Sequence, residues 1–342
     1  MTDLAQDTLL KVSELKVHFP RGGGWGKPVE VVKAVDGVTF DVKRGTTLAV
    51  VGESGSGKTT TALAVLRLAP VTAGSIQLGA TALDALGGEA LRLERRRMQI
   101  IFQDPFSSLN PRERAGAAVR APLDLMNVGT PAERTARVAE LFTQVGLRPE
   151  QQHLFPHQFS GGQRQRINIA RALATNPELV VCDEPVSALD IAIRAQILNL
   201  LARLQRDLGL TYLFISHDMA VVENICDDIA VMYLGQIVER APRKPFFARP
   251  LHPYSAALMS AVPTVHGGRS RAAQRIKLSG DPPSPINPPA GCRFAARCPV
   301  AERACAAEPQ VLREVMPGHF VACRRVRVDG GVAVPPLAMP DV

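Results

Sequence analysis

The chain has 342 residues, of which 46% are hydrophobic and 21% are charged. These fractions are typical of globular domains, and they exclude a mostly disordered or collagen-like chain. The length is sufficient to bury a core without disulfide staples. The formal net charge is +8, but the basic residues are scattered and form no long tract, so we expect no nucleic-acid partner.

No apolar stretch is long enough to cross a bilayer, which takes about 18–20 residues. The longest stretches, 208–215 and 229–234, fall well short of that length. The first seven residues include Asp3 and Asp7 and no apolar core, so they do not predict a secretory signal. We therefore expect the chain to stay in the cytosol unless a partner holds it at a membrane.

Strands and helices alternate over roughly the first 245 residues. Residues 46–51 form a short apolar run that enters a glycine-rich turn and then a helical stretch, 59–68. Further strands are predicted at 179–182 and 211–216, with a helix between them over 191–204. Strands spaced by helices predict an α/β fold with a mostly parallel sheet covered on both faces.

The segment from about 105 to 175 has a different character. It contains helical patterns and no evident strand, which predicts a helical insertion into the α/β unit. The three expected helices cover residues 119–126, 132–145 and 163–174.

The composition changes after Arg240. Residues 281–290 contain five prolines and must therefore be extended or turning. Four cysteines follow, and from residue 329 onward glycine and proline recur without a period, which predicts a loose tail. The expected divisions are a first domain over 8–245, a cysteine-bearing domain over 246–328 and a flexible tail over 329–342.

A glycine-rich motif follows the first predicted strand. Residues 52–59 read Gly-Glu-Ser-Gly-Ser-Gly-Lys-Thr and fit the pattern G-x-x-x-x-G-K-[ST] between a strand and a helix. The glycines let backbone N–H groups surround phosphates, and the N-terminus of the following helix adds its positive dipole end. Lys58 is placed for the β- and γ-phosphates, and Thr59 is placed for Mg²⁺.

The strand at 179–182 leads into two carboxylates, Asp183 and Glu184. Asp183 can hold Mg²⁺, and Glu184 can orient and polarise an attacking water in phosphoryl transfer. Between the two motifs, residues 159–163 read Phe-Ser-Gly-Gly-Gln just before a helix. Ser160 is a candidate N-cap and the glycines expose the backbone, so this segment either binds a second phosphate or only caps the helix.

Six motifs in this order resemble the nucleotide-binding subunit of an ABC transporter, over roughly residues 8–240. Besides the three described above, they are Gln103 after an apolar strand, Ser187-Ala-Leu-Asp190 and Ile215-Ser-His217-Asp. The resemblance implies a P-loop NTPase (RecA-like) core with an antiparallel β subdomain and an α-helical signature subdomain. It also implies hydrolysis of ATP to ADP and phosphate.

The resemblance further implies that two such domains close head to tail on two ATP molecules, and that Asp190 belongs to the loop that crosses their interface. The implied catalytic residues are Glu184, His217 and Gln103, and the implied Mg²⁺ ligands are Thr59, Gln103 and Asp183. The implied nucleotide-binding residues are Gly52, Ser54, Gly55, Ser56, Gly57, Lys58, Thr59, Thr60, Gln103, Ser160, Gly161, Gly162, Gln163, Asp183 and Asp190.

The sequence departs from the family pattern in two places. Phe159 stands where the family usually has leucine, and both side chains are apolar. The aromatic residue that stacks on adenine near the N-terminus is not obvious. Val29 falls near its usual position, and Phe19 and Trp25 are the alternatives.

The C-terminal part resembles a narrower family. Residues 245–255, with their His-Pro-Tyr motif, and 284–299 are similar to the tail of ATPases from oligopeptide and dipeptide importers. Nickel and other small-solute importers share this tail. The resemblance implies that the chain powers the import of peptides across the bacterial inner membrane. It also implies that the chain lies at the cytoplasmic side of that membrane as a peripheral protein. The segment after Gln103, with residues 106–111, is implied to receive a permease helix.

The same resemblance implies several partners. They are two transmembrane permease subunits, an extracytoplasmic substrate-binding protein and a second ABC ATPase subunit. For the two ATPases, a heterodimer is favoured over a homodimer.

Four cysteines crowd the C-terminal part: Cys292, Cys298, Cys305 and Cys323, with the spacing C-x5-C-x6-C-x17-C. Structural zinc sites usually contain a tight C-x2–4-C pair, which is missing here. Four thiolates on longer loops can hold a [4Fe–4S] cluster, and the resemblance implies one because relatives with this tail carry it. The alternatives are a zinc ion, no metal, or a disulfide.

We therefore expect the ATP-hydrolysing subunit of a bacterial peptide importer. A soluble ABC-type ATPase acting on nucleic acid or ribosomes would suit the charge of +8, but such proteins usually carry two nucleotide domains, and this chain has one P-loop. An iron–sulfur redox or sensor protein that uses ATP as a regulator is the second alternative.

Overall fold

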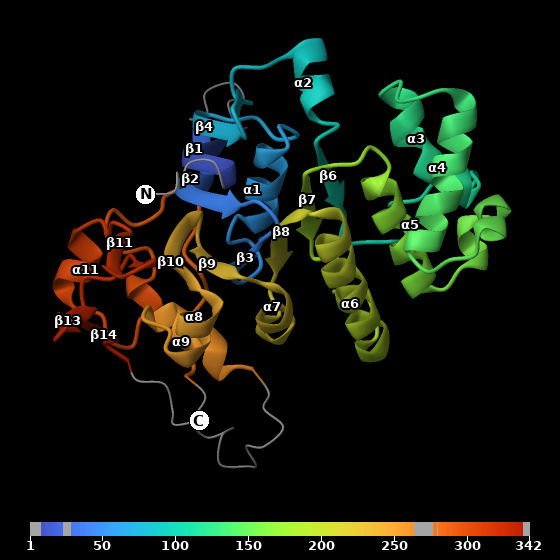
Figure 1. The fold of residues 1–342 in the computed structure, drawn as a ribbon. Helices are drawn as coiled ribbons and strands as arrows, with labels where there is room; N and C mark the ends of the chain where they lie inside the picture. Colours follow the sequence, from blue (N-terminus) through green and yellow to red (C-terminus); the bar gives the residue numbers. More distant parts are fainter. Residues whose placement is uncertain (1–7, 23–28, 263–275, 279, 338–342) are drawn as a thin grey trace, which may run out of the picture. The chain divides into compact units, whose positions relative to one another are not determined.

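The computed structural model describes residues 8–22, 29–262, 276–278 and 280–337 (Figure 1). The chain divides into two compact units. Unit 1 comprises the described residues of 1–11, 41–47 and 77–215, and unit 2 comprises those of 12–40, 48–76 and 216–342. Within the described residues, no helix has the length and apolar character that crossing a membrane requires.

Unit 1 contains three parallel strands in the order β8-β7-β6. They are β6 (Met98–Ile101), β7 (Leu179–Asp183) and β8 (Thr211–Ser216). Every residue of β7 and β8 is buried, as expected for parallel strands covered on both faces. The helix α6 (Ile191–Leu208) follows β7 and ends at Gly209, whose φ of 66° a glycine adopts without strain.

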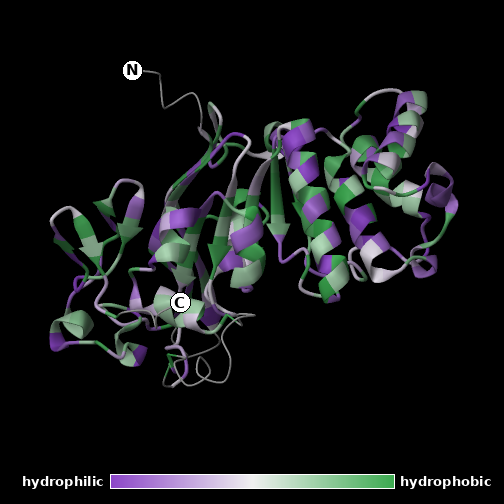
Figure 2. Ribbon diagram, turned by 60° about the horizontal axis from the view of Figure 1, so that its bottom comes forward, coloured by the Kyte–Doolittle hydropathy of each residue, from purple (hydrophilic) through white to green (hydrophobic). Residues whose placement is uncertain are grey.

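The chain between β6 and β7 is described throughout and forms helices without a strand. The helices are α3 (Ala115–Leu125), α4 (Pro131–Gln144) and α5 (Gly161–Leu173), with 3-10 turns η1 (Pro149–His153) and η2 (Pro156–Gln158). They are two-faced in hydropathy (Figure 2), and α4 buries Val138, Leu141 and Phe142. The three helices that the sequence predicts are therefore all present.

Unit 2 contains strands in the order β11-β12-β10-β9-β3. Their bounds are β3 (Thr47–Val51), β9 (Asp228–Tyr233), β10 (Gln236–Pro242), β11 (Arg313–Met316) and β12 (His319–Val321). Only β3 and β9 are parallel, and the other pairs are antiparallel. The tight turn at Leu234 and Gly235 joins β9 directly to β10, and such a short connection requires antiparallel pairing.

A second sheet has the strand order β2-β1-β4-β5. Its strands are β1 (Thr8–Gly22), β2 (Val29–Lys43), β4 (Ala73–Leu78) and β5 (Thr81–Ala82). Three further helices are α1 (Lys58–Val65), α2 (Gly88–Glu94) and α7 (Met219–Ile225). The helix predicted over 59–68 is shorter in the structure, because Arg67 adopts a left-handed φ of 56° soon after α1 ends.

The C-terminal region contains the helices α8 (Arg243–Ala248), α9 (Pro253–Ser260) and α11 (Arg303–Ala307) and the 3-10 turn η3 (Ala295–Arg297). Part of the segment from residue 329, for which the sequence predicts a loose tail, forms strands in the structure. β13 (Arg327–Asp329) and β14 (Val332–Val334) form an antiparallel hairpin that buries Ala333 completely. Its turn, Gly330–Gly331, has positive φ at both positions, which fits a two-residue hairpin loop. Residues 338–342 of that tail lie outside the described residues.

A buried carboxylate joins the C-terminal region to the sheet of unit 2. Glu239 on β10 is fully buried and accepts hydrogen bonds from the backbone N–H groups of Leu251 and His252, each at 2.8 Å. Its Oε1 atom also lies 2.8 Å from Nε2 of His319 on β12. This one side chain therefore satisfies three groups that would otherwise be buried without partners.

We predict that Glu239→Ala lowers the free energy of unfolding by about 3 kcal/mol, because truncation leaves three buried polar groups unpaired. Urea denaturation followed by circular dichroism measures the change. Glu89→Ala is the matched control, since Glu89 forms its ion pair with Arg92 at the exposed surface and its loss should leave the urea midpoint close to that of the parent chain. Equal stability of the Glu239→Ala variant and the parent chain would contradict this account.

Candidate functional site

The glycine-rich loop predicted to bind phosphates lies in unit 2, between β3 and α1. Gly52 has a φ of 154°, and a Cβ atom there would lie 2.1 Å from the carbonyl oxygen of Met232. Gly57 has a φ of 105°, and a Cβ atom there would lie 2.3 Å from the carbonyl oxygen of Ala34. Because real Cβ atoms do not approach backbone this closely, both positions require glycine.

Lys58 is the first residue of α1 and is buried. Its Nζ atom donates hydrogen bonds to the carbonyl oxygens of Gly52 and Glu53, both at 2.8 Å. The ammonium group is thus held across the loop, at the N-terminal end of a helix, where the positive end of the helix dipole attracts anions. In this loop Ser56 is buried, Thr60 is half-buried, and Ser54, Gly55 and Thr59 are exposed.

Unit 1 carries the second set of predicted residues. Asp183, the last residue of β7, is buried, and Glu184 follows it with a left-handed φ of 47°. This backbone conformation is costly for a residue other than glycine. The N–H of Glu184 donates to the carbonyl oxygen of Ile215 at 3.1 Å, which holds the residue at the end of the parallel strands.

The structure brings Gln103 and Glu184 together, although 81 residues separate them in the chain. The side-chain amide of Gln103 donates a hydrogen bond of 3.0 Å to the Glu184 carboxylate. An amide donor can hold a carboxylate in one orientation through such a bond.

The Ser-Gly-Gly-Gln segment caps α5. The backbone N–H of Gln163 donates to the Ser160 hydroxyl at 3.3 Å, and the Gln163 side chain accepts from the N–H of Ser160 at 3.0 Å. A Cβ atom on Gly162 would lie 2.6 Å from a methyl carbon of Ile193 on α6, so glycine is required where the two helices approach. Gly161 has ordinary clearance.

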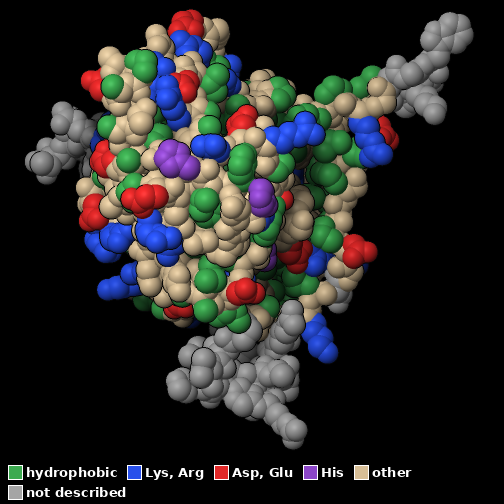
Figure 3. All heavy atoms as spheres, turned by 90° about the vertical axis from the view of Figure 1, so that its right-hand side faces the viewer, with side chains coloured by type: hydrophobic (Ala, Val, Ile, Leu, Met, Phe, Trp, Pro, Cys, Tyr) green, Lys and Arg blue, Asp and Glu red, His purple; other side chains and the backbone are tan. Residues whose placement is uncertain are grey.

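A groove of about 630 Å³ opens in unit 1 along the segment that contains Gln103. It is lined by Gln99, Ile100, Phe102, Gln103, Asp104, Ser107, Ser108, Pro122, Arg171, Ala172 and Asp183. Arg171 donates to the carbonyl oxygen of Ser108 at 2.6 Å, which attaches the floor of the groove to α5. The face seen in Figure 3 mixes acidic, basic and apolar side chains rather than gathering one charge.

The other predicted residues lie at element ends. His217 is exposed in the turn between β8 and α7, and Asp190 is exposed at the N-cap of α6. Of the candidates for adenine stacking, Phe19 is half-buried in β1, Val29 is 59% exposed at the start of β2, and Trp25 lies outside the described residues. Gln103, Asp183, Glu184, Asp190 and the Ser160 segment belong to unit 1, whereas the P-loop and His217 belong to unit 2.

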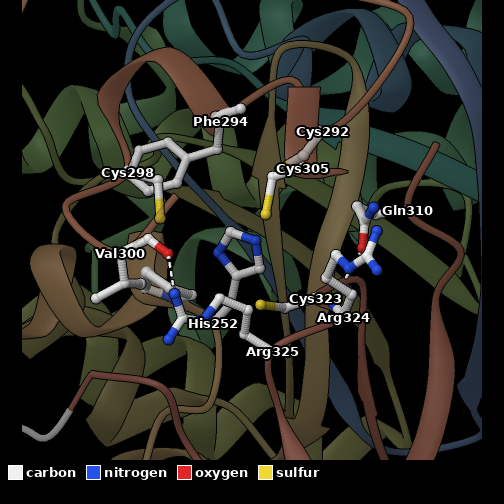
Figure 4. Close-up of a pocket in the computed structure, with 12 residues that line it drawn as sticks. His252, Cys292, Phe294, Cys298, Val300, Cys305, Gln310, Cys323, Arg324 and Arg325 are labelled. Carbon is white, nitrogen blue, oxygen red and sulfur yellow. Dashed lines mark hydrogen bonds between the residues drawn. The ribbon is translucent and has the colours of Figure 1, made fainter. Parts of the chain in front are cut away.

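The four C-terminal cysteines line one pocket in unit 2, together with His252 and Phe294 (Figure 4). Burial raises the pKa of the thiols of Cys292, Cys298 and Cys323, to about 11 for Cys298, and the neighbouring thiols act in the same direction. None of these cysteines is joined by a disulfide. The pocket is therefore lined by four cysteine side chains that are not disulfide-bonded.

Among the described residues, no three His, Cys, Asp or Glu side chains are grouped so that they could hold a metal ion. The four cysteines predicted to bind a metal thus line one pocket, but they are not arranged as a site that could hold a single ion. Cys182 and Cys226 are also free and buried, away from this pocket's lining, and burial raises the pKa of Cys226 to about 12.

The sequence analysis missed the contacts that Glu53 makes with the C-terminal region. Glu53 is a variable position of the P-loop pattern, so the motif gave no signal there. Arg297 donates to both of its carboxylate oxygens, and the Tyr254 hydroxyl accepts from its backbone N–H. Tyr254 belongs to the His-Pro-Tyr motif, and the motif itself indicates no contact with the P-loop.

Solved structures similar to this chain are ATP-binding cassettes. The dimeric cassette MJ0796 bound to ADP and Pi matches with a TM-score of 0.61 and 28% identity, covering 69% of this chain and 99% of that one. CbiO1 of Clostridium perfringens, part of the transporter complex cbiONQ, matches with a TM-score of 0.60 and 27% identity, covering 71% of this chain and 92% of that one.

Family models and curated proteins extend the similarity to the C-terminal region. Residues 35–187 match the family described as ABC transporter, and residues 238–305 match the oligopeptide/dipeptide transporter C-terminal region. An oligopeptide transport ATP-binding protein of Bacillus subtilis is 48% identical over 94% of this chain and 99% of its own length. A putative peptide import ATP-binding protein of Brucella ovis is 49% identical over 94% and 99%, respectively. The chain therefore belongs to the ABC transporter ATP-binding proteins that carry the oligopeptide/dipeptide transporter C-terminal region.

Proposed function

We propose that this chain hydrolyses ATP to drive the import of peptides through permease subunits in the bacterial inner membrane. The P-loop is the observation that carries the proposal, since its buried Lys58 ammonium is held at the N-terminus of α1, where phosphates bind. The names of the relatives in Bacillus subtilis and Brucella ovis, which refer to oligopeptide transport and peptide import, support peptides as the cargo.

The nucleotide chemistry is assigned to the residues named from the motifs. Lys58 and the loop amides bind the β- and γ-phosphates, and Thr59, Asp183 and Gln103 supply oxygen ligands to Mg²⁺. Glu184 orients the attacking water and accepts its proton, and its left-handed backbone and bond to Gln103 fix the carboxylate. His217 contacts the γ-phosphate, and Ser160 with Gly162 binds the nucleotide of a second ATPase subunit.

The partners follow from the same proposal. Two permease subunits change conformation when the ATPase subunits close on ATP. A substrate-binding protein outside the cytoplasm delivers the peptide, and a second, distinct ATPase subunit completes the dimer. The groove beside Gln103 is suited to a short permease helix, because Phe102 and Phe106 expose 39% and 53% of their surface in the adjoining segment. The chain is thereby held at the cytoplasmic side of the membrane.

The proposal includes a [4Fe–4S] cluster held by Cys292, Cys298, Cys305 and Cys323. Four thiols facing one pocket provide the ligand number that such clusters use. A structural zinc ion is less suited to this sequence, because such sites usually contain a tight C-x2–4-C pair and the four cysteines have the spacing C-x5-C-x6-C-x17-C. The cluster would contribute iron–thiolate bonds that cross-link the C-terminal region.

We predict that Glu184→Gln lowers the ATPase rate by at least about 100-fold, because glutamine cannot accept the proton of the attacking water. Steady-state phosphate release measures the rate, and calorimetric titration with MgADP should show unchanged nucleotide binding. Glu140→Gln, an exposed carboxylate on α4, is the control and should leave the rate unaltered. An ATPase rate that survives Glu184→Gln would remove Glu184 from the catalytic role.

A second prediction concerns iron. Protein purified without oxygen should contain about four irons per chain and absorb broadly near ~400 nm, as four-cysteine clusters do. Cys298→Ser should lower both signals, whereas Cys226→Ser should leave them unchanged because Cys226 does not line this pocket. Colourless protein that contains zinc or no metal would exclude the cluster while leaving the ATPase assignment intact.

A further inference from the structure

Glu53, the second residue of the P-loop, is held from two sides by the C-terminal region. Arg297 donates to its carboxylate through Nη1 at 2.7 Å and Nη2 at 3.1 Å, which is the bidentate geometry that makes arginine–carboxylate pairs strong. The hydroxyl of Tyr254 accepts a hydrogen bond of 2.8 Å from the backbone N–H of Glu53. All three residues belong to unit 2.

Arg297 is itself firmly placed. Only 8% of its side chain is exposed, against 32% for Glu53, and its guanidinium lies 5.9 Å from the centre of the Tyr233 ring. Its Nη1 atom also donates to the Tyr233 hydroxyl at 3.4 Å. An arginine side chain with little exposed surface, held by several partners, loses little further freedom when it pairs with a carboxylate, so it can fix the position of that carboxylate.

An aromatic cluster supports both contacts. Tyr233, Tyr254 and Phe294 are fully buried or nearly so, and their ring centres lie 4.7 to 5.4 Å apart in tilted or edge-on arrangements. Such pairs are favourable and hold the rings in one orientation. Phe294 also lines the cysteine pocket, so the same cluster connects that pocket with the P-loop.

The charge of Glu53 gives these contacts a consequence for nucleotide binding. Its carbonyl oxygen accepts a hydrogen bond from Lys58 Nζ, so this residue and the phosphate-binding lysine are in direct contact. A carboxylate in such a loop repels the phosphates of a nucleotide unless a neighbouring cation compensates it. Arg297 is the cation that pairs with it.

We propose that Arg297 and Tyr254 are positioning residues for nucleotide binding, which act from the C-terminal region through Glu53 on the P-loop. Arg297 cancels the carboxylate charge, and Tyr254 fixes the backbone N–H of the loop. Neither residue is catalytic, because neither is assigned a contact with nucleotide. This inference rests on the proposed role of the P-loop in binding phosphates.

The test measures the Kd of MgADP by calorimetry, together with KM and kcat for ATP, in the full chain. Arg297→Ala should raise Kd and KM about three- to tenfold, the effect of one partly screened charge, and change kcat less than twofold.

The double variant Arg297→Ala with Glu53→Gln should return Kd to within about twofold of the parent chain, because the uncompensated charge is gone. Arg297→Lys should fall between, since it keeps the charge but loses the bidentate geometry. Tyr254→Phe removes the acceptor alone and should raise Kd by about twofold to fivefold.

Two controls separate this inference from its premise. Lys58→Ala should abolish MgADP binding, and if it does not, the proposed role of the P-loop fails first. Arg92→Ala removes an arginine that makes a similar bidentate pair with Glu89 at the surface, and it should leave Kd unchanged. With Lys58→Ala inactive in binding, the inference is overturned if Arg297→Ala binds MgADP as the parent chain does. It is equally overturned if Glu53→Gln fails to restore binding to a folded Arg297→Ala variant.

Discussion

The backbone of the P-loop passes so close to neighbouring carbonyl oxygens that two of its positions accept only glycine. The contacts are with Met232 on β9 and with Ala34 on β2. This close approach orients the loop so that the carbonyl oxygens of Gly52 and Glu53 accept hydrogen bonds from the Lys58 ammonium. A side chain at either position would push the loop away from its support and move the lysine with it. The parallel pairing of β9 with β3 therefore supports the loop that we propose binds phosphates.

The turn that follows β9 supports the loop from the other side. The N–H of Gly235 donates to the carbonyl oxygen of Ser56, and the carbonyl oxygen of Gly235 accepts from the N–H of Asp36, each at 2.8 Å. Although burial acts to raise it, the pKa of Asp36 is held below its ordinary value by bonds from Arg293 and His18. The carboxyl group of Asp36 therefore stays ionised at neutral pH. Its backbone N–H anchors the turn through the bond to Gly235.

How far the sequence predicts this molecule depends on the range of the interactions. Motifs with a fixed spacing carry their own geometry, so the P-loop and the capping box of Ser160 and Gln163 follow from local pattern. The motifs assign Gln103 and Glu184 separate roles and do not predict the hydrogen bond between them, because 81 positions separate the two residues in the chain. The C-terminal strands were not predicted at all. β12 has three residues, and its pairing depends on β10, some 80 positions earlier.

The segment between Cys292 and Cys298 makes contacts that local sequence pattern does not carry. Arg293 and Arg297 lie on either side of Phe294 in the sequence and reach the P-loop and the turn that supports it. Both arginines are charged side chains with little exposed surface, and such residues are kept buried only by specific partners. A basic residue between cysteines would ordinarily be assigned to solvent, and only its partner's position corrects that assignment.

The C-terminal region shares a core with the nucleotide-binding sheet, so it is not an appended module. Ala49 and Val51 of β3 belong to the same apolar cluster as Tyr254 and Phe294, with Cys292 and Cys298 packed against it. Close-packed interiors transmit displacement because they contain few voids. Cys292 and Cys298 enclose the segment that carries Arg293 and Arg297, so any restraint on these two thiols also restrains the two arginines. The cysteine pocket and the supports of the P-loop therefore share one packed core.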